Sequence, residues 1–364
     1  MSSFVPDPLP PTIQWSGSLQ TVLSRADTAI GRLDGAIQTL PNADLFVTMY
    51  VRKEAVLSSQ IEGTQSSLRD LLAAEAQMLT PVPDRETDEI VRYVSAMRWG
   101  LAQLSEIPVS MRLIRGMHRI LLHGVRGANQ NPGELRRIQN WIDPAGASIR
   151  EATFVPPPPQ LIEGLLDDLE RYLHSDEDIP LLLKIGFAHA QFETIHPFLD
   201  GNGRIGRLLV TFLLMEKEIL RKPVLYLSYY FKRYRSEYYE RLQAIRDNGD
   251  WEGWLVFFLR GIEIVSEEAT RTAHRVLELR ERDRSAISSE MGPSAANGHR
   301  LLESLFDRPV CSAGSARTEL ETSYATANRL VRRLVDLGIL SQLGSSHRNR
   351  RFIYLSYVDL FADA

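Results

Sequence analysis

The stretch HPFLDGNGRIGR, residues 196–207, constrains the fold more than any other part of the chain. It places three glycines, two arginines, a histidine and an aspartate directly before the apolar run LLVTFLLM. Glycines in a loop that enters a helix allow successive backbone N–H groups to turn toward one point. The positive end of the helix macrodipole adds to this effect, so the stretch predicts a binding site for an anion at a helix N-terminus.

The side chains of this stretch indicate which anion. Arg204 and Arg207 lie three residues apart in the expected first helical turn, where a cation opposes the macrodipole, so we expect them to meet a negative ligand. Guanidinium groups bind phosphate oxygens in pairs, which suits a polyphosphate. Asp200 would be repelled by phosphates unless Mg²⁺ lay between them. His196 is the group nearby that can accept a proton near neutral pH.

The rest of the chain indicates a mainly helical protein, because apolar residues recur at three-and-four spacing and alternating β-branched runs are scarce. Residues 127–160 interrupt the pattern with glycines, prolines and the alternating piece IREATFV, which predicts a small hairpin followed by a polyproline-like strip. The predicted helices are 43–60, 67–78, 87–105, 109–122, 160–175, 180–194, 204–220, 235–247 and 251–280.

Composition limits the classes of function. The 42 Lys and Arg against 46 Asp and Glu give a formal charge of -4, which favours neither nucleic acid nor an acidic membrane as the main partner. The single cysteine, Cys311, excludes an intrachain disulfide and fits a reducing compartment. The first residues lack the pattern of a signal peptide, and no apolar run reaches the roughly 20 residues of a membrane span. We therefore expect a soluble, cytoplasmic protein without a membrane partner.

The stretch from His196 to Arg207 resembles the signature of the Fic family, whose members usually transfer AMP from ATP to a hydroxyl of a target protein. The resemblance spans roughly residues 40–280 and implies a helical core. It implies that His196 deprotonates a Ser, Thr or Tyr hydroxyl, that Asp200 holds Mg²⁺, that Phe198 anchors the loop and that pyrophosphate leaves. The implied ATP- and phosphate-binding residues are Asp200, Gly201, Asn202, Gly203, Arg204, Ile205, Gly206 and Arg207.

A second motif, SSQIEG at residues 58–63, contains a glutamate at the end of a predicted helix. A carboxylate there is electrostatically misplaced, so Glu62 either points into solvent or meets a cation. The motif resembles the inhibitory motif of the Fic family, which implies that Ser58, Glu62 and Gly63 belong to an inhibitory helix at about residues 43–63. The resemblance further implies a salt bridge from Glu62 to Arg207 that holds ATP in an unproductive pose.

Two further regions are assigned through the same resemblance. The hairpin near residues 141–159 resembles the family's flap, whose edge would pair with an extended stretch of the target. Its expected contact strip is Ala152, Thr153, Phe154 and Val155, although a plain surface hairpin remains open. Residues 234–254 lie where family members hold the base, which makes adenine-pocket candidates of Tyr238, Tyr239, Arg246, Asp247 and Asn248. Packing of the tyrosines in the core is the alternative.

The C-terminal residues 299–364 resemble a winged helix, with SYATANRLVRRLVDLGIL as the recognition helix and SSHRNRR as the wing. Their arginines are suited to phosphates, yet DNA, a protein or a second copy of the chain could each be the partner. The arginines concerned are Arg329, Arg332, Arg333, Arg348, Arg350 and Arg351.

These assignments combine into a mainly α fold: a Fic-type helical core with a small β-hairpin flap and a C-terminal winged-helix domain. The expected domains are an N-terminal helical region at 1–110, the catalytic core at 111–280, a linker at 281–298 and the winged helix at 299–364. The function expected first is autoinhibited protein adenylyltransfer with ATP and Mg²⁺, in a possible homodimer. The alternatives are a DNA-binding regulator whose core senses nucleotide, and a transferase with another donor.

Overall fold

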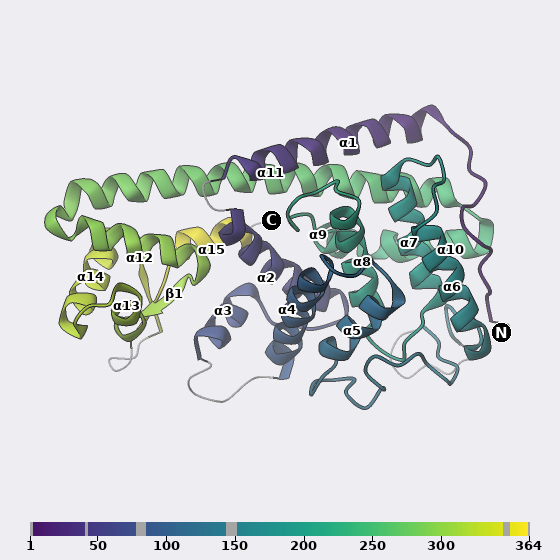
Figure 1. Ribbon diagram of the computed structural model, residues 1–364, viewed down its shortest axis with the longest axis horizontal. Helices are drawn as coiled ribbons and strands as arrows, with labels where there is room; N and C mark the ends of the chain where they lie inside the picture. The colour runs from purple at the N-terminus through teal and green to yellow at the C-terminus, as the bar shows by residue number, and fades with distance from the viewer. Residues whose placement is uncertain (1–2, 41–42, 78–84, 143–150, 345–349, 363–364) are drawn as a thin grey trace.

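The computed structural model describes residues 3–40, 43–77, 85–142, 151–344 and 350–362. The described part of the chain is mainly helical, as predicted, and contains one small antiparallel sheet near the C-terminus (Figure 1). None of the described helices is long and apolar enough to cross a membrane.

Two long helices run side by side along one edge of the molecule (Figure 1). The helix α1 (Gly17–Gln38) buries a stripe that includes Leu19, Ala26 and Leu33 against α11 (Trp251–Glu290). Asp250 begins α11 by accepting a hydrogen bond from the backbone of Gly253, which satisfies one of the free amides at the helix start. The 40 residues of α11 connect the helical core to the C-terminal part of the chain.

The core is built around α7 (Leu181–Ile195), which is buried at every residue from Leu182 onward. A helix that is apolar on all sides must be enclosed by others. Its neighbours include α6 (Ile162–Leu173), α8 (Asn202–Glu216) and α11. The remaining helices around this layer are α4 (Arg85–Gln103), α5 (Met111–Leu121), α9 (Ser228–Arg233) and α10 (Arg235–Asn248), and the short 3-10 helix η1 (Pro159–Leu161) leads into α6.

The helix α2 (Ala43–Ile61) packs across α4, α8 and α9 and so brings its C-terminal end to the start of α8. The turn after it contains Gly63, whose φ of +104° is a conformation that only glycine adopts without strain. The helix α3 (Leu68–Gln77) follows and packs on α2 and α4. The helix predicted at 43–60 is confirmed, and it holds Ser58 and Glu62 against the core.

The predicted irregular linker after residue 280 is wrong, because α11 continues to Glu290 and is followed by the 3-10 helix η2 (Gly292–Ser294) and α12 (Ala295–Asp307). Although the sequence of this region is rich in charged residues, one face of the helix is buried and contains Leu279, Asp283 and Ile287. The hydroxyl of Tyr354 donates to the carboxylate of Asp283. Charge on the other faces of a helix does not prevent it from continuing while one face is covered.

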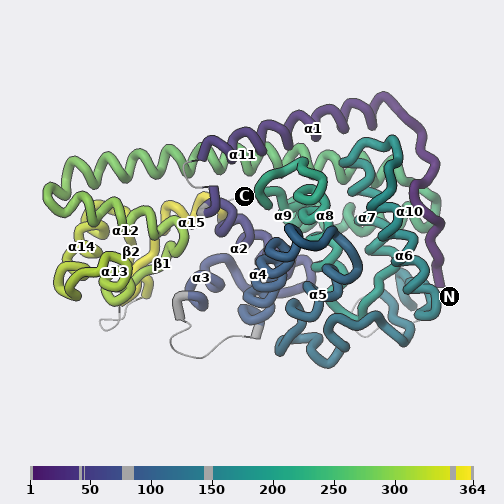
Figure 2. Tube along the Cα trace, in the orientation of Figure 1, coloured from purple at the N-terminus to yellow at the C-terminus, as the bar shows by residue number. Residues whose placement is uncertain are grey.

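The C-terminal part contains β1 (Val310–Ser312), α13 (Ala313–Leu320), α14 (Tyr324–Asp336), β2 (Ser341–Leu343), β3 (Arg351–Ile353) and α15 (Leu355–Ala362). The central strand β3 pairs antiparallel with β1 on one side and β2 on the other, with Phe352 opposite both Cys311 and Gln342. The last helix, α15, turns back onto α2 and α11 (Figure 2). The winged-helix assignment stays a prediction, and residues 345–349 of the expected wing lie outside the described residues.

The expected flap is described only at its two ends. Ile142 and Phe154 form an isolated antiparallel bridge, with hydrogen bonds in both directions. Residues 143–150 between them lie outside the described residues.

Candidate active site

The loop between α7 and α8 is held in one conformation by its own side chains. His196 ends α7 with a φ of +49°, and Gly201 precedes α8 with a φ of +77°. The side-chain oxygen of Asn202 accepts a hydrogen bond from the backbone N–H of Phe198 at 2.8 Å, and its amide nitrogen donates to the carbonyl of Phe198 at 2.8 Å. The first helical amides of α8 are therefore presented by a rigid turn.

Phe198 anchors the loop, and its partner in the core is a histidine that the sequence analysis missed. Phe198 is fully buried and stacks on His118, with ring centroids 3.8 Å apart. The Nδ1 atom of His118 accepts from Gly133 at 2.8 Å, so its proton lies on Nε2, which donates to the carbonyl of Asp200 at 2.9 Å. Burial lowers the pKa of His118 to about 4, which keeps the ring neutral.

His196 is placed to act as a proton acceptor. Its carbonyl accepts a hydrogen bond from Nε of the buried Arg136 at 2.9 Å, which fixes its backbone. The Nδ1 atom of His196 is buried and has no hydrogen-bond partner in the part of the chain that the structure describes. Burial first, and then the nearby charge of Arg246, lower the pKa of His196 to about 4. The ring is therefore neutral at neutral pH, which is the form that can take a proton.

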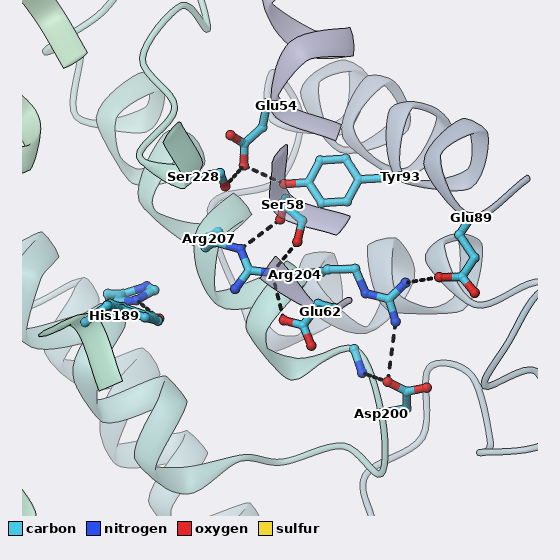
Figure 3. Close-up of polar contacts among 12 residues, drawn as sticks. Glu54, Ser58, Glu62, Glu89, Tyr93, His189, Asp200, Arg204, Arg207 and Ser228 are labelled. Carbon is cyan, nitrogen blue, oxygen red and sulfur yellow. Dashed lines mark hydrogen bonds and ion pairs between the residues drawn. The ribbon is translucent and has the colours of Figure 1, made fainter. Parts of the chain in front are cut away.

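Arg204 is buried with hydrogen bonds left unmade. Its side chain is 1% exposed, and its carboxylate neighbours are Asp200 at 3.4 Å and Glu89 at 3.8 Å (Figure 3). Among the described residues, its Nε and Nη1 atoms have no hydrogen-bond partner. A buried charge with unsatisfied donors is costly, so this guanidinium fits a site that receives an anion.

Arg207, one turn further along α8, is bound by Ser58 of α2 and by Glu62, which directly follows α2 (Figure 3). Its Nε donates to Oγ of Ser58 at 2.8 Å, and its Nη2 donates to the carbonyl of Ser58 at 3.0 Å and to Oε1 of Glu62 at 2.8 Å. Burial alone would raise the pKa of Glu62, but the charges of Arg207 and Arg204 outweigh it and lower the pKa. Both partners are therefore charged, and the anion at Arg207 is a side chain of the same protein.

Two glycines of α8 make room for carboxylates. A Cβ atom on Gly203 would lie 2.5 Å from Oε1 of Glu62, and one on Gly206 would lie 2.2 Å from Oε1 of Glu193. Glu193 was missed by the sequence analysis. Burial raises the pKa of Glu193 to about 7 despite the charge of Arg207, and its Oε1 has no hydrogen-bond partner in the described chain. At Gly206, one of the implied phosphate-binding residues, the group that approaches closely in this structure is a carboxyl group.

The expected flap strip lies close to the site but is partly covered. Phe154 and Val155 are buried, and the guanidinium of Arg246 lies 3.7 Å from the ring centroid of Phe154. The backbone N–H of Phe4 donates to the carbonyl of Val155 at 2.9 Å, so an N-terminal segment already occupies part of this edge. Ala152 is also buried, whereas Thr153 is exposed.

The two tyrosines expected near adenine lie in different surroundings. Tyr238 is 1% exposed, stacks on Phe231 and shares a 3.0 Å hydrogen bond between its hydroxyl and Nε2 of His189. Tyr239 is 42% exposed with its ring centroid 5.2 Å from that of Tyr238. Tyr239 is therefore the more accessible of the two, and the guanidinium of Arg235 lies 5.8 Å from its ring centroid. Asp247 and Asn248 are exposed at the C-terminal end of α10, beyond Arg246.

Two adjoining parts of the chain match known protein-family models. Residues 20–102 match the Fic/DOC family N-terminal model, and residues 108–214, which contain the whole loop, match the Fic/DOC family model. A probable protein adenylyltransferase from Aquifex aeolicus is 41% identical over 69 residues, covering 19% of this chain and 22% of the relative. A protein adenylyltransferase Fic from Drosophila yakuba is 30% identical over 244 residues, covering 64% and 43%. The chain thus spans less than half the length of these relatives.

Solved structures of low sequence identity share the fold. A Fic family protein from Desulfovibrio desulfuricans G20 aligns over 95% of this chain and 98% of its own, with a TM-score of 0.62 and 18% identity. Fic-1, residues 134–508, from C. elegans aligns over 72% and 74%, with a TM-score of 0.54 and 22% identity. The helical core, the loop that carries His196 and the two family matches agree, and the chain belongs to the Fic/DOC family.

Proposed function

We propose that this chain is a protein adenylyltransferase that moves AMP from ATP to a hydroxyl of a target protein. The observation that carries the proposal is the buried Arg204, whose Nε and Nη1 have no hydrogen-bond partner in the described chain, beside the neutral His196 and the N-terminal amides of α8. The phosphates of a triphosphate would supply the hydrogen-bond acceptors that these two nitrogens lack. The imidazole supplies the base that an attacking hydroxyl needs.

The proposed reaction balances as a nucleotidyl transfer. His196 takes the proton of a Ser, Thr or Tyr hydroxyl, and the oxygen attacks the α-phosphorus of ATP. The bond from that phosphorus to the bridging oxygen breaks, and pyrophosphate leaves with the electron pair. The rigid turn of Asn202 and the amide of Gly203 position the phosphates, since such reactions depend on alignment and charge neutralisation more than on covalent catalysis.

We propose that Mg²⁺ accompanies the nucleotide at Asp200. Within the described residues, no cluster of three or more His, Cys, Asp or Glu side chains could hold a metal by itself. Mg²⁺ is commonly held by one or two carboxylates together with phosphate oxygens, which fits a single aspartate beside a triphosphate. Asp200 is 30% exposed, and its Oδ1 accepts from the backbone of Gly201 at 2.6 Å. The ion would neutralise phosphate charge.

We propose that Glu62 inhibits this reaction. Its carboxylate occupies Arg207, which would otherwise bind the terminal phosphate of ATP. Release of Glu62 would free a second buried guanidinium one turn from Arg204.

The expected flap strip is proposed to hold the backbone of the target protein. Tyr239 is proposed to hold the adenine ring.

The test uses variants of two residues, Glu62 and His196, with each of the four labelled nucleoside triphosphates and Mg²⁺. Glu62→Gly should increase self-labelling by ATP sharply relative to wild type, because Arg207 becomes available. Glu62→Gln is the matched control that keeps the side-chain size and removes the charge, and it should give an intermediate increase. In the Glu62→Gly background, His196→Ala should bind nucleotide and transfer none.

Two results would overturn the proposal. One is labelling that persists at the same rate without the His196 imidazole. The other is no labelling of the Glu62→Gly variant by any nucleotide over a wide concentration range. If another nucleoside triphosphate labels the protein better than ATP does, the proposed transfer reaction stands. The transferred group is then that nucleotide rather than AMP.

A DNA-binding role is the second candidate, because Arg329 and Arg332 are exposed on α14. A third arginine of α14, Arg333, instead donates to the carbonyl of Met291 at 3.1 Å and holds α14 against the preceding helices. Duplex binding that weakens with salt and is lost in the Arg329→Gln/Arg332→Gln variant would support this role. Such binding would be compatible with transfer, whereas a nucleotide sensor would bind ATP and transfer nothing.

A further inference from the structure

A cleft of about 330 Å³ lies away from the active site, between the N-terminal helices and the start of the C-terminal sheet. Its walls come from α2, α3 and α4 on one side and from residues 308–310 on the other. Apolar side chains such as Leu72 and Val94 line it together with three arginines and one glutamate, Glu75. The volume is that of a small-molecule site rather than a packing defect.

The cleft has more positive than negative charge. Arg52 is 6% exposed; its Nη2 pairs with Glu75 at 2.8 Å and its Nη1 donates to the carbonyl of Asp307 at 3.0 Å. Its buried Nε has no hydrogen-bond partner among the residues described. Arg308 pairs with the carboxylate of Asp307 at 3.5 Å, whereas no ion pair of Arg98 is found in the described ranges. Among the described residues that line the cleft, three arginines stand against one glutamate, and Asp307 beside it pairs with Arg308, which favours an anionic ligand.

The position of the cleft connects it to Glu62. Arg52 is on α2 and Glu75 is on α3, and these two helices directly precede and follow the segment that carries Glu62 and Gly63. The bond from Arg52 to Asp307, the last residue of α12, extends the connection to the C-terminal part of the chain. An anion that competes with Glu75 for Arg52 would therefore loosen the contact between the helices on either side of Glu62.

We propose that this cleft is a regulatory site for a small amphipathic anion, an apolar ring or chain that bears a sulfonate, phosphate or carboxylate, and that its occupancy loosens the segment carrying Glu62. The apolar walls would hold the body of the ligand, Arg98 and Arg308 would attract its charge at the mouth, and its anionic group would compete with Glu75 for Arg52. A ligand that binds one arrangement better than the other shifts their populations by its difference in affinity. The effect on transfer rests on the proposed function, whereas the binding does not.

The binding is tested on the full chain with 1-anilinonaphthalene-8-sulfonate, a fluorescent probe that combines apolar rings with one sulfonate. One saturable site is expected, weakened at least about tenfold, or roughly 1.4 kcal/mol, in the Arg98→Gln/Arg308→Gln variant. The matched control is Arg92→Gln/Arg317→Gln, which removes two arginines from α4 and α13 outside the cleft and should bind as wild type does. Arg98→Lys/Arg308→Lys keeps the charge and should retain binding. Equal affinity in both Gln variants, or no saturable binding, overturns the site.

The coupling is tested by hydrogen exchange, which does not depend on catalysis. Probe at saturation should speed amide exchange in residues 58–67 of wild type, because local opening becomes easier there. The Arg98→Gln/Arg308→Gln variant should show no change at the same probe concentration. Unchanged exchange in wild type with the site occupied would overturn the regulatory role. If the Glu62→Gly variant fails to transfer AMP while probe binding and exchange behave as expected, the proposed function fails and this site stands.

Discussion

Arg204 and Arg207 lie one helical turn apart on α8, and their surroundings are unequal. Arg207 donates three hydrogen bonds to Ser58 and Glu62, whereas Nε and Nη1 of Arg204 have no hydrogen-bond partner in the described chain. Buried donors are normally paired, so this incomplete bonding supports the proposal that Arg204 binds an anionic ligand. The neutral state of His196 follows from the same burial that encloses these arginines.

The pKa of His196 predicts the pH dependence of transfer. A base acts only when deprotonated, and burial and the charge of Arg246 lower its folded-state pKa to about 4. The rate of the Glu62→Gly variant should therefore stay constant from about pH 8 to pH 6 and decline only toward the folded-state pKa. Single-turnover labelling at each pH, with folding followed by circular dichroism, measures this. A half-maximal rate near pH 6.5, the ordinary value for histidine, would contradict the assignment.

Gly206 predicts a packing defect that can be rescued. Gly206→Ala places a methyl group 2.2 Å from Oε1 of Glu193 and should destabilise the protein by about 1–3 kcal/mol. Glu193→Ala removes the clash, so the two substitutions together should cost less than their sum in urea unfolding. Gly35→Ala, in an exposed part of α1 with no atom within 4 Å of the new Cβ, is the control and should stabilise slightly. Strict additivity would show that Glu193 does not approach Gly206.

At the scale of elements, α2 is attached to the core through a buried carboxyl group (Figure 3). Glu54 accepts hydrogen bonds from the hydroxyls of Tyr93 on α4 and Ser228 on α9, four residues before Ser58 on the same helix. The other oxygen of Glu54 has no partner among the described residues. This attachment fixes the helix that carries Ser58 and Glu62.

The pKa of Glu54 predicts how stability changes with pH. Burial raises it from 4.5 to about 7 in the folded protein, although Ser228, Arg207 and Tyr93 oppose the shift. Because the folded state binds this proton more tightly, the contribution of Glu54 to stability is fully present below about pH 4.5 and is lost as pH rises from about 4.5 to 7. Glu54→Gln removes this loss, so the melting temperature of the variant should rise relative to wild type between pH 5 and pH 8. The exposed Glu240→Gln variant should follow wild type, and a Glu54→Gln difference that is the same at both pH values would be inconsistent with a raised pKa.

At the scale of the whole molecule, α11 joins the active-site core to the C-terminal part as one uninterrupted helix (Figure 2). One side of α11 is covered by α12 and α15. This part of the helix therefore belongs to the folded structure and is not a flexible linker.

Limited proteolysis distinguishes a helix from an irregular linker. Trypsin should spare the bonds after Arg280, Arg282 and Arg284 in the native protein, because cleavage requires local unfolding of α11. The same bonds should be cut once urea unfolds this part of the helix. Rapid native cleavage there, separating a core from a C-terminal fragment, would argue against the continuous helix.

Features that depend on neighbouring residues in the sequence could be predicted, whereas features that depend on contacts between distant parts of the chain could not. The helices from 43 to 248 that the sequence predicts agree with the structure to within a few residues, because their apolar spacing is local. Residues 17–38 are expected only as part of a helical N-terminal region. The extension of α11 and the strand β1 depend on partners elsewhere in the chain, Tyr354 and β3.

The same distinction holds for the candidate site. The polar residues of 196–207 and 58–63 could be identified because each set is contiguous. His118 is 82 residues from Asp200, and Arg136 is 60 residues from His196, so only the fold brings them together. Glu193 gives no local signal, since its carboxyl group matters through its approach to Gly206.

The most direct test of the central claim compares ATP labelled at the α-phosphate with ATP labelled at the γ-phosphate on the Glu62→Gly variant. The account predicts that the protein keeps the α label, that the γ label leaves as pyrophosphate and that neither label is retained after His196→Ala. Retention of the γ label on the protein, or an α label that persists without the imidazole, would contradict it.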